Sequence, residues 1–346
     1  MGNSTSNKCQ LCGSTSHMMH DSFPGYQEGM LFEIHFCNEC NTSFPKPTAD
    51  ASEIYDFIYK HGENVPGYDR YWEYFNKIKN QNNPLKFLAD SEEAYWGVKE
   101  AINQRVIDKK NAKILEIGSG LGYLTYALRK DNYNVFGLDI SDEAVNQANA
   151  NFGNFYVCRD LFDYSKTHAE TFDVVILTEV IEHVEKPIDF LKAITQLLKK
   201  NGAIILTTPN KSIAPDDIIW DTEAPPIHHW WLSENSIEYI ANFLKCSVRF
   251  VDFEKFYKKK PTVYRFGAAR RKILRAPILS ENMELLKTAV KKKPTKLKKS
   301  YKNFIASIPY LKMTFLKLKI KLGNKSVYCS KRGKILCAIL LKEEGV

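Results

Sequence analysis

The stretch from residue 113 to residue 209 restricts the fold most, because short apolar runs alternate there with amphipathic stretches. Five runs read as buried strands: "KILEIG", "VFGLD", "FYVCRD", "FDVVILTE" and "GAIILTTP". The stretches "YLTYALRKD", "DEAVNQANANF" and "KPIDFLKAITQLLKK" read as helices. Strands separated by helices predict a doubly wound, mostly parallel α/β sheet. Ligands of such sheets bind beyond the carboxyl ends of the strands.

The first predicted strand ends in "EIGSGLG", which contains Glu116, Gly118, Gly120 and Gly122. Glycines at this spacing let the backbone turn tightly and approach a ligand closely. A dinucleotide site would need a glycine at position 123, which is tyrosine, and a P-loop would need a lysine that is absent. The carboxylate of Glu116 would repel a pyrophosphate and suits an ammonium group.

The next two predicted strands also end in carboxylates. Asp139, followed by Ile140, closes the second strand, where a carboxylate accepts both hydroxyls of a ribose. Asp160, followed by Leu161, closes the third strand, where an adenine could be hydrogen-bonded and packed. The pattern predicts an adenosine without phosphates that carries an amino acid, and S-adenosyl-L-methionine fits this description.

These stretches resemble a known family. "LEIGSGLG", "VFGLDIS", "CRDLF" and "FDVVILTEVIEHVEKP" are similar to successive motifs of class I S-adenosylmethionine-dependent methyltransferases. The resemblance covers residues 110–254 and "KILCAILLKEE" near the end. It implies a Rossmann-like sheet of seven strands, with "SVRFVDFE" as the sixth and an antiparallel seventh between the fifth and sixth. It also implies cofactor contacts from the following residues: Glu116, Gly118, Gly120, Gly122, Asp139, Ile140, Asp160, Leu161 and Glu179.

The fourth predicted strand runs into "LTEVIEHVEKP", which places Glu179, Glu182 and His183 beyond its end. If a helix begins at Glu179, these side chains share one face. Three interpretations stay open: an ordinary helix start, His183 as general base for an acceptor hydroxyl, or a divalent metal bound together with a later histidine. His228 and His229 are the later candidates, and with Glu182 they could assist His183. The motif resembles the metal-binding motif of ubiquinone-pathway O-methyltransferases and of small-RNA 2′-O-methyltransferases.

Four of the eight cysteines form two Cys-x-x-Cys pairs near the start: Cys9, Cys12, Cys37 and Cys40. Paired thiolates on two tight turns make a tetrahedral cage of the kind that Zn²⁺ accepts. Four cysteines leave no open coordination position, so the sequence predicts a structural zinc ribbon. A ribbon joined to this core resembles a subset of bacterial methyltransferases that act on sugars in surface-glycan or natural-product pathways.

Charge is distributed unevenly along the chain. The net charge is +9, but residues 254–334 carry +22 and the remainder carries −13. Helix-like apolar positions (Phe304, Ile305, Ile308, Leu311, Phe315 and Leu316) accompany the lysines. Three interpretations stay open: a surface helix on anionic lipid, a nucleic-acid patch, or a solvated lysine face over core.

The resulting division is a zinc ribbon (1–48), a helical connector (49–110), the methyltransferase core (111–254), a basic helical insertion (255–330) and a final strand (331–346). The expected activity is methyl transfer from S-adenosylmethionine to a hydroxyl of a sugar, as a small molecule or a lipid-linked glycan. The alternatives are an RNA methyltransferase, a sugar C-methyltransferase and an inactive binding scaffold. The start lacks a secretory signal, so a cytoplasmic location is expected, with peripheral contact to the inner membrane face through the basic segment.

Overall fold

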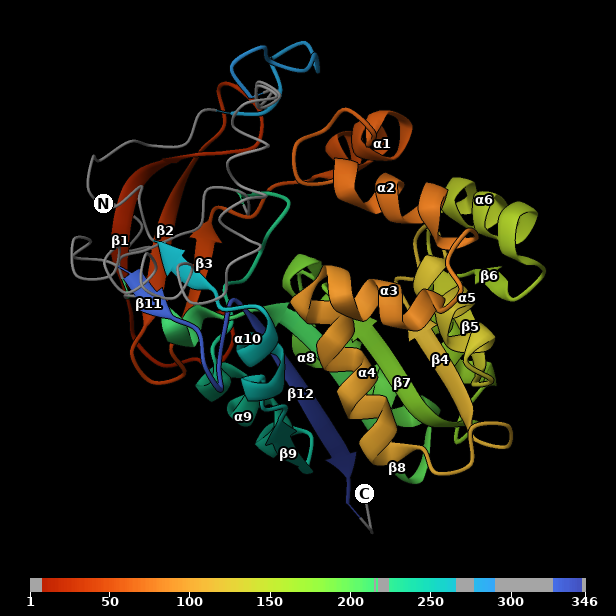
Figure 1. Cartoon of the computed structure of the whole chain (residues 1–346). Helices are drawn as coiled ribbons and strands as arrows, with labels where there is room; N and C mark the ends of the chain where they lie inside the picture. The colour runs from red at the N-terminus through yellow and green to blue at the C-terminus, as the bar shows by residue number, and fades with distance from the viewer. Residues whose placement is uncertain (1–7, 215, 217–223, 266–276, 290–325, 344–346) are drawn as a thin grey trace.

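The computed structural model of the chain describes residues 8–214, 216, 224–265, 277–289 and 326–343. A large sheet flanked by helices carries a small antiparallel sheet at one end and a pair of helices above its edge (Figure 1). No helix among these residues combines the length and the apolar character needed to cross a bilayer.

The large sheet has seven strands in the order β6-β5-β4-β7-β8-β12-β9. β12 is antiparallel to β8 and β9, and the other neighbours in this sheet are parallel. The bounds are β4 (Lys113–Ile117), β5 (Asn134–Asp139), β6 (Tyr156–Cys158), β7 (Phe172–Thr178), β8 (Leu198–Pro209), β9 (Cys246–Phe250) and β12 (Ile335–Lys342). The predicted doubly wound sheet is therefore confirmed, including its antiparallel strand between the fifth and sixth.

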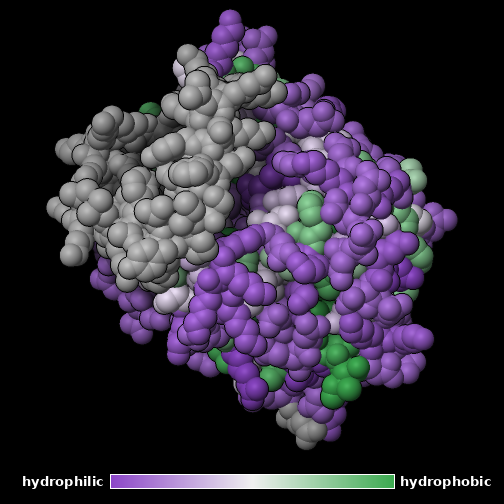
Figure 2. All heavy atoms as spheres, in the orientation of Figure 1, coloured by the Kyte–Doolittle hydropathy of each residue, from purple (hydrophilic) through white to green (hydrophobic). Residues whose placement is uncertain are grey.

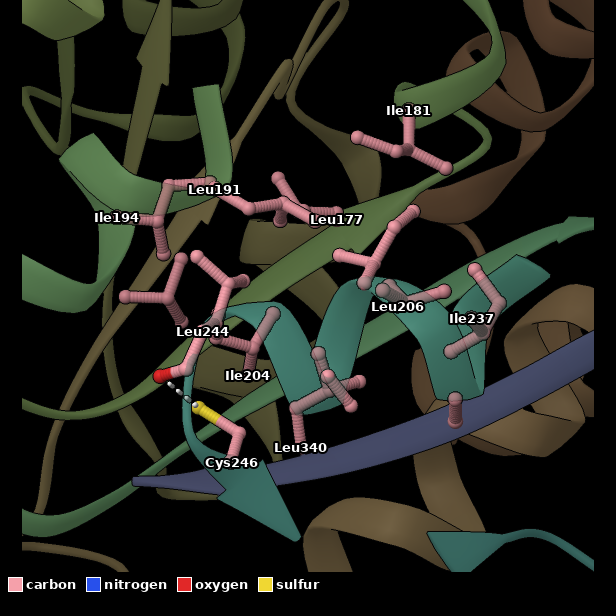
Figure 3. Packing of buried hydrophobic residues seen from close by; sticks show 14 of the residues in the cluster. Leu177, Ile181, Leu191, Ile194, Ile204, Leu206, Ile237, Leu244, Cys246 and Leu340 are labelled. Atoms are coloured by element: carbon pink, nitrogen blue, oxygen red, sulfur yellow. Dashed lines mark hydrogen bonds between the residues drawn. The ribbon is translucent and has the colours of Figure 1, made fainter. Parts of the chain in front are cut away.

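Helices cover both faces of this sheet, which explains why the strands read as continuous apolar runs. One face packs on α7 (Leu161–Thr167), α8 (Pro187–Leu197) and α9 (Glu234–Phe243). Figure 3 shows this packing, in which Leu177, Leu206 and Leu340 of the strands lie among residues of α8 and α9. The other face packs on α3 (Pro84–Ser91), α4 (Glu93–Arg105), α5 (Tyr123–Lys130), α6 (Asp142–Phe152) and α10 (Glu254–Lys259).

The small sheet is built from β1 (Ser16–Pro24), β2 (Leu31–Cys37) and β3 (Thr42–Lys46), all antiparallel. It is tied to the large domain by backbone hydrogen bonds between Ser43 and Trp231 in both directions, at 2.9 and 3.2 Å. The hydroxyls of Ser233 and Ser236 donate to the carbonyl oxygen of Cys40 at 3.2 and 2.9 Å. The ribbon is therefore docked onto the start of α9.

Two of the helices between the ribbon and the sheet form a cap. Pro66 and Gly67 lie between α1 (Ser52–His61) and α2 (Asp69–Ile78). α3 and α4 also lie within the stretch 49–110 that was expected to be helical. Asn83 caps α3 by accepting a hydrogen bond from the Lys86 amide, which with Pro84 at the first turn is a typical helix start.

The basic segment is described only in part. β10 (Val263–Arg265) pairs with β11 (Ser326–Tyr328), and residues 277–289 contain no helix. Backbone hydrogen bonds join Ile278 and Leu279 to Tyr26 of the ribbon. The predicted lysine-rich helical stripe falls in residues 290–325, outside the described residues. The proposed boundaries between domains stay a prediction.

Candidate active site

A cavity of about 940 Å³ lies beyond the carboxyl ends of β4, β5 and β7, beneath the cap helices α1 and α2. Figure 2 shows the surface hollowed on this face, in the orientation of Figure 1. Eight carboxylates line the cavity against three cationic side chains, Lys60, Arg70 and Arg159. Such a balance favours a cationic ligand over a phosphorylated one.

The glycine loop between β4 and α5 forms one wall. Gly118 has φ of +71° and a side chain there would meet Val180 at 2.5 Å, so the position accepts only glycine without rearrangement. The amide of Gly120 donates to Asp139 at 2.7 Å, which ties the loop to β5. Gly122 does not line the cavity, because its missing side chain makes room for Tyr156 and Ala148.

Glu116, at the base of this wall, is a buried carboxyl group with 3% of its surface exposed. It accepts a hydrogen bond from the Thr125 hydroxyl at 2.5 Å. Burial raises the pKa of Glu116 to about 8, and the Thr125 hydrogen bond opposes this shift. A cationic group placed against Glu116 would remove its proton.

Asp139 ends β5 and is also buried. Its two oxygens accept from the amides of Gly120 and Ser141, at 2.7 and 2.9 Å. Burial raises the pKa of Asp139, whereas these backbone hydrogen bonds lower it. Each oxygen keeps a lone pair for a ligand hydroxyl. The next residue, Ile140, lines the cavity with 73% of its surface exposed, which leaves an apolar face ready for a flat ring.

Asp160 and Leu161 both line the cavity, at the point where β6 leads into α7. Asp160 is the N-cap of α7, and one of its oxygens accepts from the amides of Phe162 and Asp163, at 2.8 and 3.1 Å. Leu161 is buried. The carboxylate of Asp160 thus has a structural role, and its second oxygen accepts none of the hydrogen bonds described for this residue.

No α-helix begins at Glu179, so the condition for a shared helix face is not met. β7 ends at Thr178, Glu179 has a left-handed backbone with φ of +54°, and a 3₁₀ turn follows at η1 (Ile181–His183). The left-handed residue interrupts helical continuity, so Glu179, Glu182 and His183 do not share one helix face. Instead the Tyr71 hydroxyl donates to Glu179 at 2.9 Å.

His183 lies in the cavity wall beside His228, with ring centroids 4.4 Å apart and edge-to-face. Burial lowers the pKa of His183 to about 4, so the ring is neutral. Glu182 is 1% exposed, and its carbonyl accepts from the amides of His229 and Trp230, at 2.9 and 3.2 Å. Glu182 and His228 line the cavity, whereas His229 does not.

The divalent-metal group that the sequence left open as one of three interpretations is not formed by the described residues. Within the described parts of the chain, the four cysteines are the one set of three or more His, Cys, Asp or Glu side chains whose ligand atoms converge. Glu179, Glu182 and His183 are not brought within such a distance, because Glu179 pairs with Tyr71 and lies 3.5 Å from the Arg70 guanidinium.

The cap contributes aromatic residues from the stretch that the sequence assigns to the helical connector. Tyr55, Tyr59, Tyr68, Tyr71 and Trp72 all line the cavity. Tyr55 and Tyr59 lie four residues apart on α1, a spacing that could have indicated a shared face. Tyr68 and Arg70 are in the wall as well, and the guanidinium of Arg70 also pairs with Glu92 at 2.8 Å.

The cysteine group lies in the ribbon, apart from this cavity. Its four sulfur atoms are within 4.8 Å of one another, with pairs at 3.7 Å (Cys9 and Cys40) and 3.5 Å (Cys12 and Cys37). A tetrahedron with metal–sulfur bonds of about 2.3 Å has edges of about 3.8 Å. The cluster is therefore compatible with zinc.

Known proteins are similar to the part of the chain that forms most of this site. Residues 95–243 match the family model described as "Methyltransferase domain". The chain is 32% identical over 158 residues to a protein of Colwellia psychrerythraea described as "Ubiquinone biosynthesis O-methyltransferase", with 42% of this chain and 61% of that protein covered. It is 36% identical over 109 residues to the human mitochondrial protein of that description, with 29% of each covered. These matches cover less than two thirds of the relatives' own length.

Solved structures of methyltransferases also align with the chain. A Haemonchus contortus phosphoethanolamine N-methyltransferase 2 aligns with 87% of this chain and 62% of its own, at 16% identity and a TM-score of 0.49. A plantazolicin methyltransferase aligns with 84% of this chain and 96% of its own, at 16% identity and a TM-score of 0.41. Because these TM-scores are below 0.5, the assignment of the fold comes from the strand order of the large sheet and not from these alignments. Over residues 95–243, the chain is similar to the family whose model is described as "Methyltransferase domain".

Proposed function

We propose that the chain transfers a methyl group from S-adenosylmethionine to a hydroxyl group of a sugar. The observation that carries this proposal is the placement of Glu116, Asp139 and Asp160, at the ends of three neighbouring strands, around one acidic cavity that also contains His183. When bound, the cofactor supplies a methyl group on a cationic sulfur.

Residues that line the cavity match the successive parts of this cofactor. Glu116 would hold the ammonium group, and its raised pKa means that binding releases a proton. Asp139 would accept the ribose hydroxyls with the lone pairs left free by Gly120 and Ser141. The exposed face of Ile140, together with Leu161 and Asp160, would pack and orient the adenine.

His183 would take the proton of the acceptor hydroxyl. A neutral imidazole in the cavity wall is able to accept a proton as the oxygen attacks. Much of the rate would come from alignment, since methyl transfer from a sulfonium needs the two reacting atoms in line. Glu182 and His228 flank His183 and would shape the acceptor end of the cavity.

The acceptor end favours a ring that carries hydroxyls. Tyr55, Tyr59, Tyr68 and Trp72 offer flat apolar faces, while Ser52 and Asp56 of α1 add polar groups. This mixture supports a sugar, either as a small molecule or linked to a lipid. Contact of the basic segment with anionic membrane belongs to the same proposal, although its lysine-rich part lies outside the described residues.

A second acceptor class is an aromatic hydroxyl. The relatives described as "Ubiquinone biosynthesis O-methyltransferase" support it, because that description names O-methylation in the biosynthesis of ubiquinone, whose ring in the reduced form is a phenol. The same aromatic cap would stack on a phenol ring. Both acceptors share one chemistry at the cavity, which is removal of a hydroxyl proton and transfer of a methyl group to oxygen.

We further propose that the cysteine cluster holds a structural zinc ion. Four thiolate ligands fill a tetrahedral shell, and the site is outside the cavity. Zinc would then fix the ribbon and take no part in methyl transfer.

The test combines binding with product identification. Calorimetry should detect S-adenosylhomocysteine binding to the purified chain and weaker binding to Asp139→Asn. Incubation with S-adenosylmethionine labelled in the methyl group should then transfer label from the wild-type chain into sugar nucleotides or lipid-linked saccharides of a cell extract. Label in phenolic lipids would select the second acceptor, whereas label in RNA, label bound to carbon, or no transfer at all would contradict the proposal.

A further inference from the structure

Three segments that are distant in sequence meet at one ring nitrogen. Nδ1 of His183 lies 2.8 Å from the carbonyl oxygen of Ile227 and 3.0 Å from the hydroxyl of Tyr55. The Tyr55 hydroxyl also donates to the same carbonyl, at 3.2 Å. Tyr55 comes from the cap helix α1, His183 from the turn after β7, and Ile227 from the loop before α9.

The chemistry of these contacts decides where the imidazole proton sits. A carbonyl oxygen can only accept, so the nitrogen 2.8 Å from Ile227 must carry a hydrogen. A neutral imidazole has one N–H, and therefore Nε2 is left with a lone pair. The Tyr55 hydroxyl donates its own hydrogen to Ile227 and presents its oxygen to Nδ1, which is consistent with the same tautomer.

Burial keeps this arrangement in one protonation state. The pKa of His183 is lowered to about 4 by burial, and burial raises the pKa of Tyr55. The ring and the hydroxyl are therefore both neutral near pH 7. Both residues also line the cavity, which brings the cap into contact with the group that would receive a proton.

We propose that Tyr55 is a positioning residue, which with the Ile227 carbonyl holds His183 as the tautomer protonated at Nδ1 and leaves Nε2 as the proton acceptor. The proton transfer to Nε2 rests on the proposed function. The acceptor O–H bond breaks and its proton moves to Nε2, the oxygen bonds to the methyl carbon, and the electron pair of the broken carbon–sulfur bond stays on sulfur. The cap thereby orients the base as well as enclosing the acceptor.

Nitrogen NMR of the full chain, with ¹⁵N-labelled histidine, reads the tautomer directly and needs no substrate. His183→Asn identifies the His183 signals by their loss, and its amide still donates to Ile227. The expected wild-type spectrum has a protonated Nδ1 and an unprotonated Nε2. A protonated Nε2 would overturn the proposal.

Two tyrosine variants test the positioning role. Tyr55→Phe should shift the His183 nitrogen signals and lower kcat about fivefold, the loss expected for one hydrogen bond, while KM for the cofactor stays within twofold. Tyr59→Phe, one turn further along α1, is the matched control and should leave the His183 signals in place. Unchanged signals and unchanged kcat in Tyr55→Phe would refute the role of Tyr55.

The activity of His183→Asn separates the two proposals. Loss of methyl transfer, with the hydrogen bond to Ile227 retained, supports Nε2 as the acceptor of the proton, and full activity refutes it. If the wild-type chain transfers no methyl group while His183 shows the expected tautomer, the proposed function fails and the tautomer assignment stands.

Discussion

Replacing Glu116 by glutamine should make the ligand-free protein more stable at alkaline pH while it weakens cofactor binding. The side chain is 3% exposed and burial raises its pKa from the ordinary 4.5 to about 8. Glutamine has nearly the same shape and can still accept the hydrogen bond of the Thr125 hydroxyl. The substitution therefore removes the ionisation and leaves the packing.

The direction of the pH effect on stability follows from the number of protons that the folded and unfolded states bind. Because the folded pKa of Glu116 is the higher one, the folded state holds a proton between about pH 4.5 and pH 8 that the unfolded state has lost. Stability from this group is fully present below pH 4.5 and is lost as the pH rises through 8. The difference in pKa corresponds to about 5 kcal/mol in total, of which about 4 kcal/mol falls between pH 5 and pH 9.

Urea denaturation of wild-type and Glu116→Gln protein at pH 5, 7 and 9, without ligand, measures this difference. The gap in unfolding free energy should widen in favour of the variant by up to about 4 kcal/mol from pH 5 to pH 9. Glu73→Gln, at an exposed carboxylate of α2, is the control and should run parallel to the wild type. Parallel curves for Glu116→Gln as well would refute a buried carboxyl with a raised pKa.

The same variant links stability to function. Loss of a charged partner for the ligand ammonium should weaken S-adenosylhomocysteine binding at least tenfold, since hydrogen bonds to charged groups contribute about 1.5–3 kcal/mol. A variant that gains stability while it loses affinity identifies Glu116 as a binding residue rather than a packing residue. Equal affinity in both proteins, measured by calorimetry at pH 8, would contradict that role.

Three further predictions concern other parts of the structure. Asp139→Asn should weaken S-adenosylhomocysteine binding at least tenfold in calorimetry, because charge-assisted hydrogen bonds to the ribose are lost; a change below twofold would contradict the ribose role. Gly118→Ala should lower the unfolding free energy by at least about 1 kcal/mol, because its φ is +71° and the added carbon meets Val180; urea denaturation checks this, and unchanged stability would contradict it. Cys12→Ser should reduce bound zinc well below one equivalent in elemental analysis and lower Tm, because three thiolates leave the cage open; full zinc content in this variant would exclude the four-cysteine site.

The strands and the carboxylates at their ends could be predicted because local sequence determines them. The run "VVIL" within β7 is apolar throughout because this strand is covered on both faces, and a residue that follows the strand must lie at the carboxyl edge of the sheet. The same argument alone predicts that Asp139, at the end of β5, lies at the carboxyl edge of the sheet. Its hydrogen bonds to Gly120 and Ser141 are local as well, since the loop and the strand end are neighbours in a parallel sheet.

The acceptor side could not be predicted in the same way, because its contacts join distant segments. Tyr55 and His183 are 128 residues apart, and nothing in either stretch indicates the other. The backbone of Glu179 adopts φ of +54°, a conformation typical of glycine or asparagine, so its sequence could not show that a helix is interrupted there. Asp160 looked like a ligand carboxylate, yet it is also the cap of α7, and both roles fit the same sequence position.

The contacts around Trp230 and Trp231 link the cysteine ribbon to the turn that carries His183. Ser43 of the ribbon pairs with Trp231, and the next residue towards the N-terminus, Trp230, donates from its indole to Val184 at 2.7 Å and from its amide to Glu182 at 3.2 Å. The turn that carries His183 is therefore supported by a segment that is itself held by the ribbon. Loss of zinc should loosen this segment before it affects the cofactor end, where Glu116 and the glycine loop rest on the large sheet. We expect chelation to raise hydrogen exchange at residues 228–232 ahead of residues 116–122, and equal rates of loss at both places would show that the ribbon does not support the site.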